Sequence, residues 1–260
     1  GAHCIIKVMD GRTPMSLKLY GLKRRSQKAA LREYLSPFDV GQSSSSIHAR
    51  IQTERAVLAL WQKEGFDVPK IYSPAFLEGF EQPCLAMEFI PGQTLTTFLL
   101  DTTIPLDHKK DIISRFCREM ARRHERALEQ QEIRLLLFHP NMSRILVLDD
   151  RLVYLDFEVM YTPDYDVKRI ASKEIGGFLY SLARCVPRQQ LHPLMECFIK
   201  AYPGKARMAF VLEEMRRFGT VPVYGWLKRF PFMFLFYSKY RKTVTFLKEF
   251  DVYTASQGIS

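Results

Sequence analysis

The sequence lacks a paired-cysteine motif and any cluster of cysteine and histidine residues. Its five cysteines are odd in number and widely scattered: Cys4, Cys84, Cys117, Cys185 and Cys197. A disulfide framework or a structural zinc site normally shows a regular spacing of such residues, so neither organises this chain. We instead expect reduced core cysteines and a cytoplasmic protein.

A long apolar run is also missing. The longest apolar stretch near the end of the chain, Phe230–Tyr237, falls far short of the roughly 20 residues that a membrane span needs. No secretory signal is recognisable at the start. The expectation is a soluble protein, or one that only touches a membrane surface.

Acidic residues are in the minority. The 38 lysines and arginines outnumber 28 aspartates and glutamates, which gives a formal net charge of +10 and a pI near 9.4. This surplus favours anionic partners such as nucleic acid, a phosphate-bearing substrate or an anionic membrane face. A soluble basic surface would explain the charge equally well.

The first 90 residues read as strand-rich with one prominent helix. His3–Val8 and Met15–Tyr20 are strand-like, and Asp10-Gly11 between them supplies the turn of a hairpin. Helical spacing of apolar residues predicts a helix over Ile47–Gly65, with Ser46 as its cap. The segment "CLAMEFIPGQTL" reads as a buried strand that Pro91-Gly92 interrupts.

Helical patterns dominate the remainder, which predicts two domains, 1–90 and 91–260. A further short helix is predicted within the first domain at Leu22–Leu35. The helices predicted in the second domain are Leu95–Leu100, Leu106–Gln131, Lys173–Arg184, Gln189–Ala201 and Ala206–Arg217. One strand pair, around the Asp149-Asp150 turn, interrupts these helices.

Three charged residues occupy positions where apolar residues would cost less free energy. Lys18 lies within the second strand, Glu54 on the apolar face of the first long helix, and Asp156 at the end of an apolar strand. Each signal alone is weak, since a strand lysine usually faces solvent. Their order suggests a lysine–glutamate ion pair beside phosphate oxygens and an aspartate that holds the bridging magnesium.

With these residues in order, the sequence resembles the protein-kinase-like superfamily, and most of all the bacterial lipopolysaccharide core kinases, which include Kdo and heptose kinases. The similar segments are "SLKLYG", "ARIQTERAVLALWQKEGFDVPKIY", "CLAMEFIPGQTL" and "RILVLDDRLVYLDFE". They span about residues 3–185. The tripeptide Asp156-Phe157-Glu158 fits the DFE variant of these families.

The resemblance implies a bilobal α+β fold, with a small strand-rich N-lobe, a larger helical C-lobe and ATP in the cleft between them. In this interpretation Lys18 contacts the α- and β-phosphates, Glu54 orients Lys18, and Asp156 binds Mg²⁺. Glu88, Phe89 and Ile90 form the hinge whose backbone faces the adenine. The acceptor would be a sugar hydroxyl on a lipid-linked core, at the cytoplasmic face of the inner membrane of a Gram-negative bacterium.

Two parts of the family pattern are missing. No GxGxxG segment precedes Lys18, and the catalytic loop has His139 and Arg144 where the family has aspartate and asparagine. His139 could still accept a hydroxyl proton, Asn141 could coordinate a metal weakly, and Arg144 could neutralise phosphate charge. The opposing interpretation is that phosphoryl transfer is lost or weakened, because arginine cannot ligate magnesium.

Two other segments bear on function. Mixed charges at helical spacing over Arg122–Arg134 predict a solvated helix end. The tail "YGWLKRFPFMFLFYSKYRKTVTFLKEF" interleaves basic and aromatic residues, which suits a membrane interface or an acidic glycolipid, single-stranded nucleic acid, or simply a helical core.

Three functions therefore stand as hypotheses. The first is an ATP- and Mg²⁺-dependent kinase acting on an anionic glycolipid or phosphorylated sugar, with peripheral contact to the inner membrane; nucleic acid is disfavoured. The second is a pseudokinase that acts as a scaffold or regulatory binding protein. A small-molecule phosphotransferase of the aminoglycoside or choline kinase type ranks third, because those families keep the catalytic aspartate.

Overall fold

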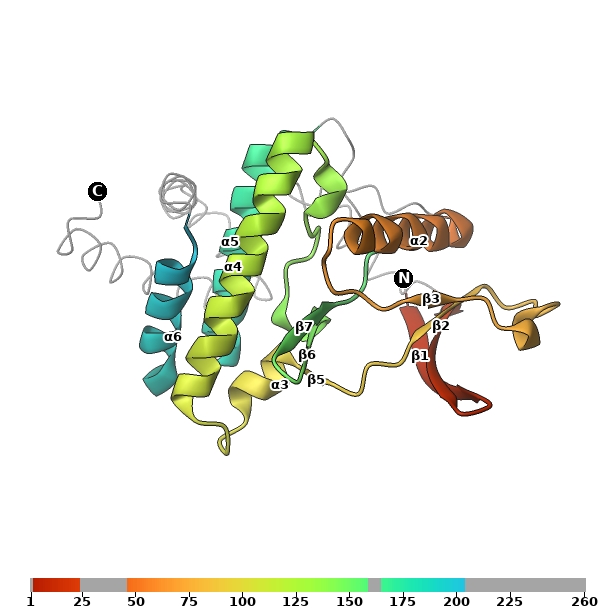
Figure 1. Ribbon diagram of the computed structural model, residues 1–260, viewed down its shortest axis with the longest axis horizontal. Coiled ribbons are helices and arrows are strands. Elements are labelled where there is room, and N and C mark those ends of the chain that lie inside the picture. Colours follow the sequence, from red (N-terminus) through yellow and green to blue (C-terminus); the bar gives the residue numbers. More distant parts are fainter. Residues whose placement is uncertain (1, 24–45, 159–164, 204–260) are drawn as a thin grey trace, which may run out of the picture. The chain divides into compact units, whose positions relative to one another are not determined.

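The computed structural model describes residues 2–23, 46–158 and 165–203 (Figure 1). The predicted helices Leu22–Leu35 and Ala206–Arg217 and the aromatic-basic tail lie largely or wholly outside these residues. The chain divides into two compact units. The first holds residues 1–95, 126–138 and 143–167, and the second holds 96–125, 139–142 and 168–260.

A four-stranded antiparallel sheet forms the start of the first unit, in the order β1-β2-β4-β3. Its strands are β1 (Ala2–Asp10), β2 (Thr13–Lys23), β3 (Ile71–Tyr72) and β4 (Cys84–Glu88). The β1–β2 hairpin turns at Gly11-Arg12, one residue later than the predicted Asp10-Gly11, because Asp10 pairs with Thr13 at the end of β1. Lys18 lies opposite Leu85 of β4. Lys18 is therefore on an inner strand, bordered on both sides.

Helix α2 (Ile47–Lys63) buries one face within the same unit. The Ser46 side chain accepts a hydrogen bond from the Ala49 N–H, which confirms the predicted cap. The buried face consists of Arg50, Ile51, Glu54, Val57, Leu58 and Trp61. Two charged residues on a buried face require ionic partners, and both have them.

A second sheet in this unit has three antiparallel strands, β5 (Gln93–Thr94), β6 (Ile145–Leu148) and β7 (Arg151–Tyr154). The β6–β7 hairpin closes with Asp149 and Asp150, both at positive φ, which suits a tight two-residue turn. Gly92 packs so closely on β6 that an added Cβ would lie 2.7 Å from the Val147 carbonyl oxygen. A side chain at residue 92 would push β5 away from the sheet.

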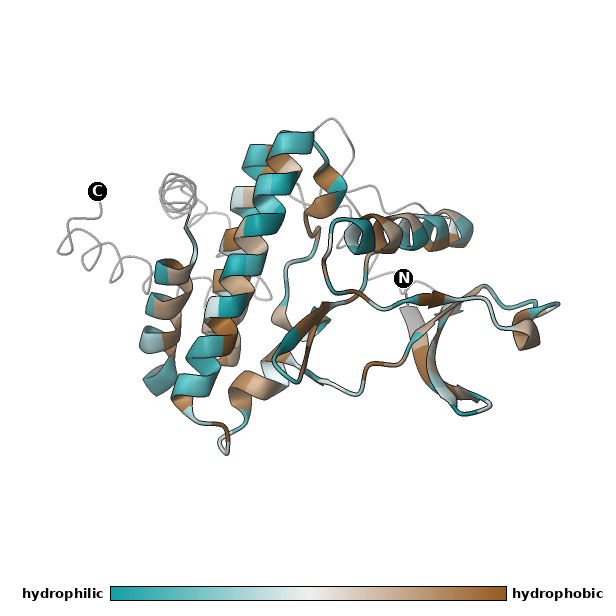
Figure 2. Cartoon of the chain, in the orientation of Figure 1, coloured by the Kyte–Doolittle hydropathy of each residue, from teal (hydrophilic) through white to brown (hydrophobic). Residues whose placement is uncertain are grey.

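The described part of the second unit, up to residue 203, consists of helices and the loops that join them. Its helices are α3 (Leu95–Leu100), α4 (Leu106–Gln130), α5 (Val167–Cys185) and α6 (Arg188–Ala201). The first residue of α3, the last five residues of α4 and the first residue of α5 are assigned to the first unit. The Phe116 ring of α4 contacts Phe178 of α5 and Phe198 of α6 at centroid distances of 4.7 and 6.0 Å. Figure 2 shows hydrophilic and hydrophobic residues alternating along α4 and α6, as expected of helices with one buried face.

Short 3₁₀ helices complete the described elements: Ala75–Leu77, Ile133–Leu135 and Met142–Arg144. The predicted α+β class, with a strand-rich start and a mostly helical remainder, is confirmed. Helix α5 begins six residues before the predicted Lys173. The predicted domain boundary near residue 90 stays a prediction, and the β6–β7 hairpin belongs to the first compact unit.

Candidate functional site

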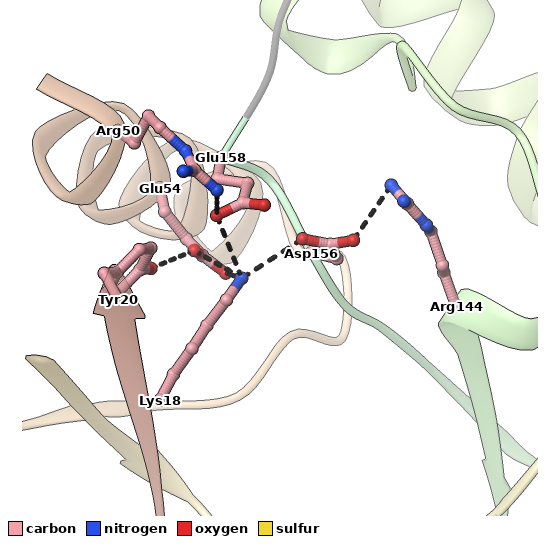
Figure 3. Close-up of polar contacts among 7 residues, drawn as sticks. All are labelled: Lys18, Tyr20, Arg50, Glu54, Arg144, Asp156 and Glu158. Carbon is pink, nitrogen blue, oxygen red and sulfur yellow. Dashed lines mark hydrogen bonds and ion pairs between the residues drawn. The ribbon is translucent and has the colours of Figure 1, made fainter. Parts of the chain in front are cut away.

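Lys18 is the centre of a buried ion cluster in the first unit (Figure 3). Its ammonium donates to Glu54 Oε1 and Oε2 at 3.0 and 2.8 Å and to Asp156 Oδ1 at 3.1 Å. Glu158 Oε2 lies at 3.9 Å from the same nitrogen. The three residues that the sequence singled out, Lys18, Glu54 and Asp156, are thus in direct contact.

Local structure explains how each of them reaches this point. Lys18 projects from β2 toward α2, and Glu54 projects from the buried face of α2. Asp156 lies two residues after the end of β7, with a φ of 71° that non-glycine residues seldom adopt. Aspartate tolerates the left-handed region better than most residues, and strained backbone of this kind concentrates at functional sites.

The register of the β6–β7 hairpin brings Arg144 to Asp156. Ile145 is opposite Tyr154, and one step further the Leu155 N–H donates to the Arg144 carbonyl oxygen at 2.9 Å. Arg144 Nη1 then lies 2.9 Å from Asp156 Oδ2. The two oxygens of Asp156 therefore face two different cations, Lys18 and Arg144.

Sequence reasoning missed two members of the cluster. The Tyr20 hydroxyl donates to Glu54 Oε2, and Arg50 forms an ion pair with Glu158. Both carried a periodic signal: Tyr20 is two residues after Lys18 on a strand, and Arg50 is four residues before Glu54 on a helix. Each therefore shares a face with a residue that the sequence does single out.

Ionisation follows from these contacts. Burial by itself lowers the pKa of Lys18, but the carboxylates of Glu54, Asp156 and Glu158 outweigh that effect and raise it. Burial would raise the pKa of Asp156, yet Lys18 and Arg144 together lower it. Burial, then the charge of Glu54, raises the pKa of Tyr20. At neutral pH Lys18 and Asp156 are charged and Tyr20 is not.

The other predicted site residues lie elsewhere in the chain. Glu88 ends β4, where its N–H donates to the Lys70 carbonyl oxygen at 2.8 Å, and the Lys7 ammonium lies 4.2 Å from the centroid of the Phe89 ring. Ile90 follows in the chain. The hinge role of these three residues stays a prediction.

His139 and Asn141 belong to the second unit, where their loop is held against α5. Asn141 Oδ1 accepts from the Ser181 hydroxyl at 3.3 Å, and the Met142 N–H donates to the same hydroxyl at 3.1 Å. A Cβ on Gly177 would lie 2.3 Å from Pro140 Cγ, so the loop and the helix are in close contact. The catalytic roles given to His139 and Asn141 stay predictions.

Magnesium does not fit this arrangement of side chains. Mg²⁺ needs a near-octahedral set of oxygens at about 2.0–2.1 Å. Both oxygens of Asp156 already meet a cation, and a guanidinium beside the metal would repel it. Within residues 2–23, 46–158 and 165–203, no group of three or more histidine, cysteine, aspartate or glutamate residues could hold a metal ion.

The segment Arg122–Arg134, predicted to be a solvated helix end, is exposed at Arg122, Glu125 and Arg126 but also contains buried charged residues. Arg123 and His124 are both fully buried, and Arg123 Nη1 donates to Glu174 Oε2 of α5 at 3.0 Å. His124 Nδ1 lies 2.9 Å from the Tyr202 hydroxyl. The mixed charges of this segment therefore include buried partners as well as exposed ones.

Among the described helices, none combines the length and the apolar character that crossing a membrane requires.

Comparison with known proteins gives structural matches alone. Neither a protein-family model nor a curated protein sequence matches the chain. A structure of WaaP in complex with acyl carrier protein matches with a TM-score of 0.44 and 10% identity, over 82% of this chain and 83% of that one. The Rio2 kinase from Chaetomium thermophilum matches with a TM-score of 0.45 and 17% identity, over 83% of this chain and 69% of that one.

A second Rio2 structure from Chaetomium thermophilum, an ADP/Mg²⁺–phosphoaspartate complex, matches with a TM-score of 0.44 and 17% identity, over 83% of this chain and 67% of that one. These three TM-scores all lie below 0.5, so the function proposed below rests on the geometry of the ion cluster.

Proposed function

We propose that this chain is a kinase-like nucleotide-binding protein in which phosphoryl transfer is lost or strongly weakened. The observation that carries the proposal is the Lys18 ammonium, with 2% of its side chain exposed, bound by Glu54 at 2.8 Å and by Asp156 at 3.1 Å. Burying an ammonium group costs several kcal/mol, and in this cluster the partly exposed Asp156 is shared between Lys18 and Arg144, which leaves room for another anion. A lysine held by a helix glutamate is suited to neutralising phosphate oxygens.

Binding requires an exchange of partners at Lys18. Its three N–H donors are used by the two oxygens of Glu54 and by Asp156 Oδ1. Asp156 is the more exposed of the two acids, with 16% of its side chain accessible against 1% for Glu54. A phosphate oxygen would therefore replace Asp156 at Lys18, while Glu54 keeps Lys18 oriented. Adenine binding by the backbone of 88–90 belongs to the same proposal.

Weakened transfer follows from Arg144. An acid that ligates magnesium in phosphoryl transfer has to offer its oxygens to the metal. Asp156 Oδ2 instead lies 2.9 Å from the Arg144 guanidinium. Without a metal at that oxygen, the charge that develops on the transferred phosphoryl group loses a principal stabiliser.

Transfer to a sugar hydroxyl of a lipid-linked core is the second candidate function. The net charge of +10 favours it, because an anionic glycolipid at the cytoplasmic face of the inner membrane would be attracted to such a protein. In this case ATP is the phosphoryl donor, and the acceptance of the hydroxyl proton by His139 stays a prediction.

Titration calorimetry with ATP and the Lys18→Met variant tests the first proposal. The wild-type protein should bind ATP, and Lys18→Met should weaken binding by about 100-fold, because it removes a buried charge–charge contact. Lys63→Met, an exposed lysine in the last turn of the same helix that carries Glu54, is the matched control and should bind like wild type.

Two outcomes would overturn this proposal. Wild-type protein that does not bind ATP would contradict any nucleotide-linked role. Phosphate transfer to a lipopolysaccharide core fragment, abolished by Asp156→Ala and by His139→Ala, would establish the second candidate function instead.

A further inference from the structure

Arg144 is held in place by the hairpin and not by a loose loop. It directly precedes β6, and its carbonyl oxygen accepts the Leu155 N–H at 2.9 Å. The two-residue turn at Asp149-Asp150 fixes the register of the whole hairpin. The guanidinium therefore meets Asp156 because of the backbone pairing, and a metal ion could reach Asp156 Oδ2 only by displacing a group that the sheet positions.

The Arg144 guanidinium also keeps capacity for a ligand. One third of its side chain is exposed, whereas the Lys18 side chain is almost completely buried. A guanidinium carries five N–H donors in a planar fork that suits phosphate oxygens. The ion pair with Asp156 uses Nη1. Arg144 thus presents an accessible, permanently charged anion-binding group beside Lys18.

We propose that this site binds the phosphates of a nucleotide as a metal-free anion, with Arg144 in the role that a divalent cation would otherwise have. The inference rests on the proposed nucleotide binding and specifies its ligand. Phosphate oxygens take over contacts that Asp156 makes with Lys18 and Arg144, and no covalent bond forms or breaks. Arg50, paired with Glu158, stays outside this exchange.

The position of Asp156 makes this exchange favourable. Its carboxylate is shared between Lys18 at 3.1 Å and Arg144 at 2.9 Å, so it occupies the place between two cations that a phosphate group would fill. Glu54 receives additional hydrogen bonding from Tyr20, and Glu158 has Arg50. Replacing Asp156 therefore leaves the Tyr20–Glu54 and Arg50–Glu158 contacts intact, which replacing Glu54 or Glu158 would not.

Calorimetric titration of the full chain with ATP, at one ionic strength, tests this with either EDTA or millimolar MgCl₂ present. The wild-type affinity in EDTA should equal or exceed that in MgCl₂. Arg144→Ala should weaken binding in EDTA by about tenfold or more, the usual size of a charge-assisted contact to phosphate. Arg144→Asn should bind poorly in EDTA and regain affinity in MgCl₂, because it offers the metal an oxygen in place of a repelling charge.

Arg151→Ala is the matched control, since Arg151 lies on the same hairpin and pairs with the exposed Asp67 at 3.1 Å. It removes the same charge and should leave ATP affinity unchanged in both solutions. Wild-type binding that appears only with MgCl₂ would overturn the metal-free proposal and leave nucleotide binding intact. Absence of binding in both solutions would overturn the proposed function itself. The wild-type titrations in EDTA and in MgCl₂ test the proposal even if an Arg144 variant fails to fold.

Discussion

The described residues of each compact unit include a buried ion cluster, and the two clusters differ in how completely they are closed. Arg123 of α4 and Glu174 of α5 are both fully buried, and each guanidinium nitrogen in the pair meets its own carboxylate oxygen. The Lys18 cluster is buried at Lys18 and Glu54 but open at Asp156 and Arg144, where 16% and 33% of the side chains are exposed.

Under the proposed function, this difference separates the structural role of the closed pair from the binding role of the open cluster. A closed pair of matched charges joins two helices and has no surface for a ligand. An open cluster in which one acid is shared between two cations can exchange that acid for another anion. Buried ions alone therefore do not identify a functional site; the partly exposed, shared member of the cluster does.

Breaking the closed pair should have the largest effect on stability. Glu174→Gln leaves the Arg123 charge buried without a counter-ion, which should lower the free energy of unfolding by about 3–5 kcal/mol. Glu54→Gln should cost less, roughly 1–2 kcal/mol, because Asp156 and Glu158 still surround Lys18. Urea unfolding followed by circular dichroism measures both.

Glu196→Ala provides the reference for this comparison. It breaks an i,i+4 pair with Lys200, whose side chain is 65% exposed, and should change stability by less than about 1 kcal/mol. If Glu54→Gln proved more damaging than Glu174→Gln, the Lys18 cluster would be the main structural ion network and the distinction between the two clusters would fail.

Lowering the pH should reduce the contribution of both clusters to the free energy of unfolding, and the contribution of the closed pair should fall more steeply. Burial would raise the pKa of Glu174, but Arg123 and then His124 lower it from 4.5 to about 2. A carboxyl group with a lowered folded-state pKa stabilises the fold fully above its unfolded value and loses that contribution as the pH falls toward the folded value. The free energy of unfolding should drop by about 3 kcal/mol between pH 4.5 and 2 from this group alone.

The free energy of unfolding of Glu174→Gln, measured as a function of pH, checks this prediction, because glutamine has no carboxylate to protonate. Its stability should fall less steeply than that of wild type between pH 4.5 and 2, with both measured by urea unfolding. Parallel profiles would mean that Glu174 does not keep a depressed pKa. At alkaline pH the Lys18 cluster should respond instead: its raised pKa preserves its contribution below pH 10.5, and the loss begins above that value.

The sequence identified the core of the open cluster because its charges interrupt apolar patterns. Lys18, Glu54 and Asp156 each occupy a position that the periodicity assigns to the interior, and the structure brings all three into contact. The sequence did not predict Tyr20 and Arg50 as members of the cluster. A tyrosine on a strand and an arginine near the start of a helix do not interrupt the apolar periodicity. Only their spacing from Lys18 and Glu54 indicated a shared face.

The closed pair could not be recognised in the same way. Arg123 and His124 stand in a run of mixed charges, where a buried arginine looks like an exposed one, and Glu174 lies about 50 residues away. The sequence also predicts too late a start for helix α5, because the exposed Lys168 and Arg169 in its first turn conceal the apolar period that Ile170 and Ala171 begin. Pairing across helices is a tertiary property that local periodicity does not encode.

A smaller effect than those of the buried ion pairs concerns the backbone at Asp156, whose conformation places this carboxylate between Lys18 and Arg144. Asp156→Gly and Asp156→Ala both remove the carboxylate, so the two ion pairs are lost equally. They differ in backbone cost: at a φ of 71° alanine is disfavoured by about 1 kcal/mol relative to glycine. The glycine variant should therefore be the more stable of the two by about that amount in urea unfolding. Asp150, at a φ of 65° in the exposed hairpin turn, should give a difference of the same sign without any ion pair to Lys18. Equal stabilities at residue 156 alone would show that Asp156 leaves the left-handed region in solution, and the carboxylate would then not be held between Lys18 and Arg144.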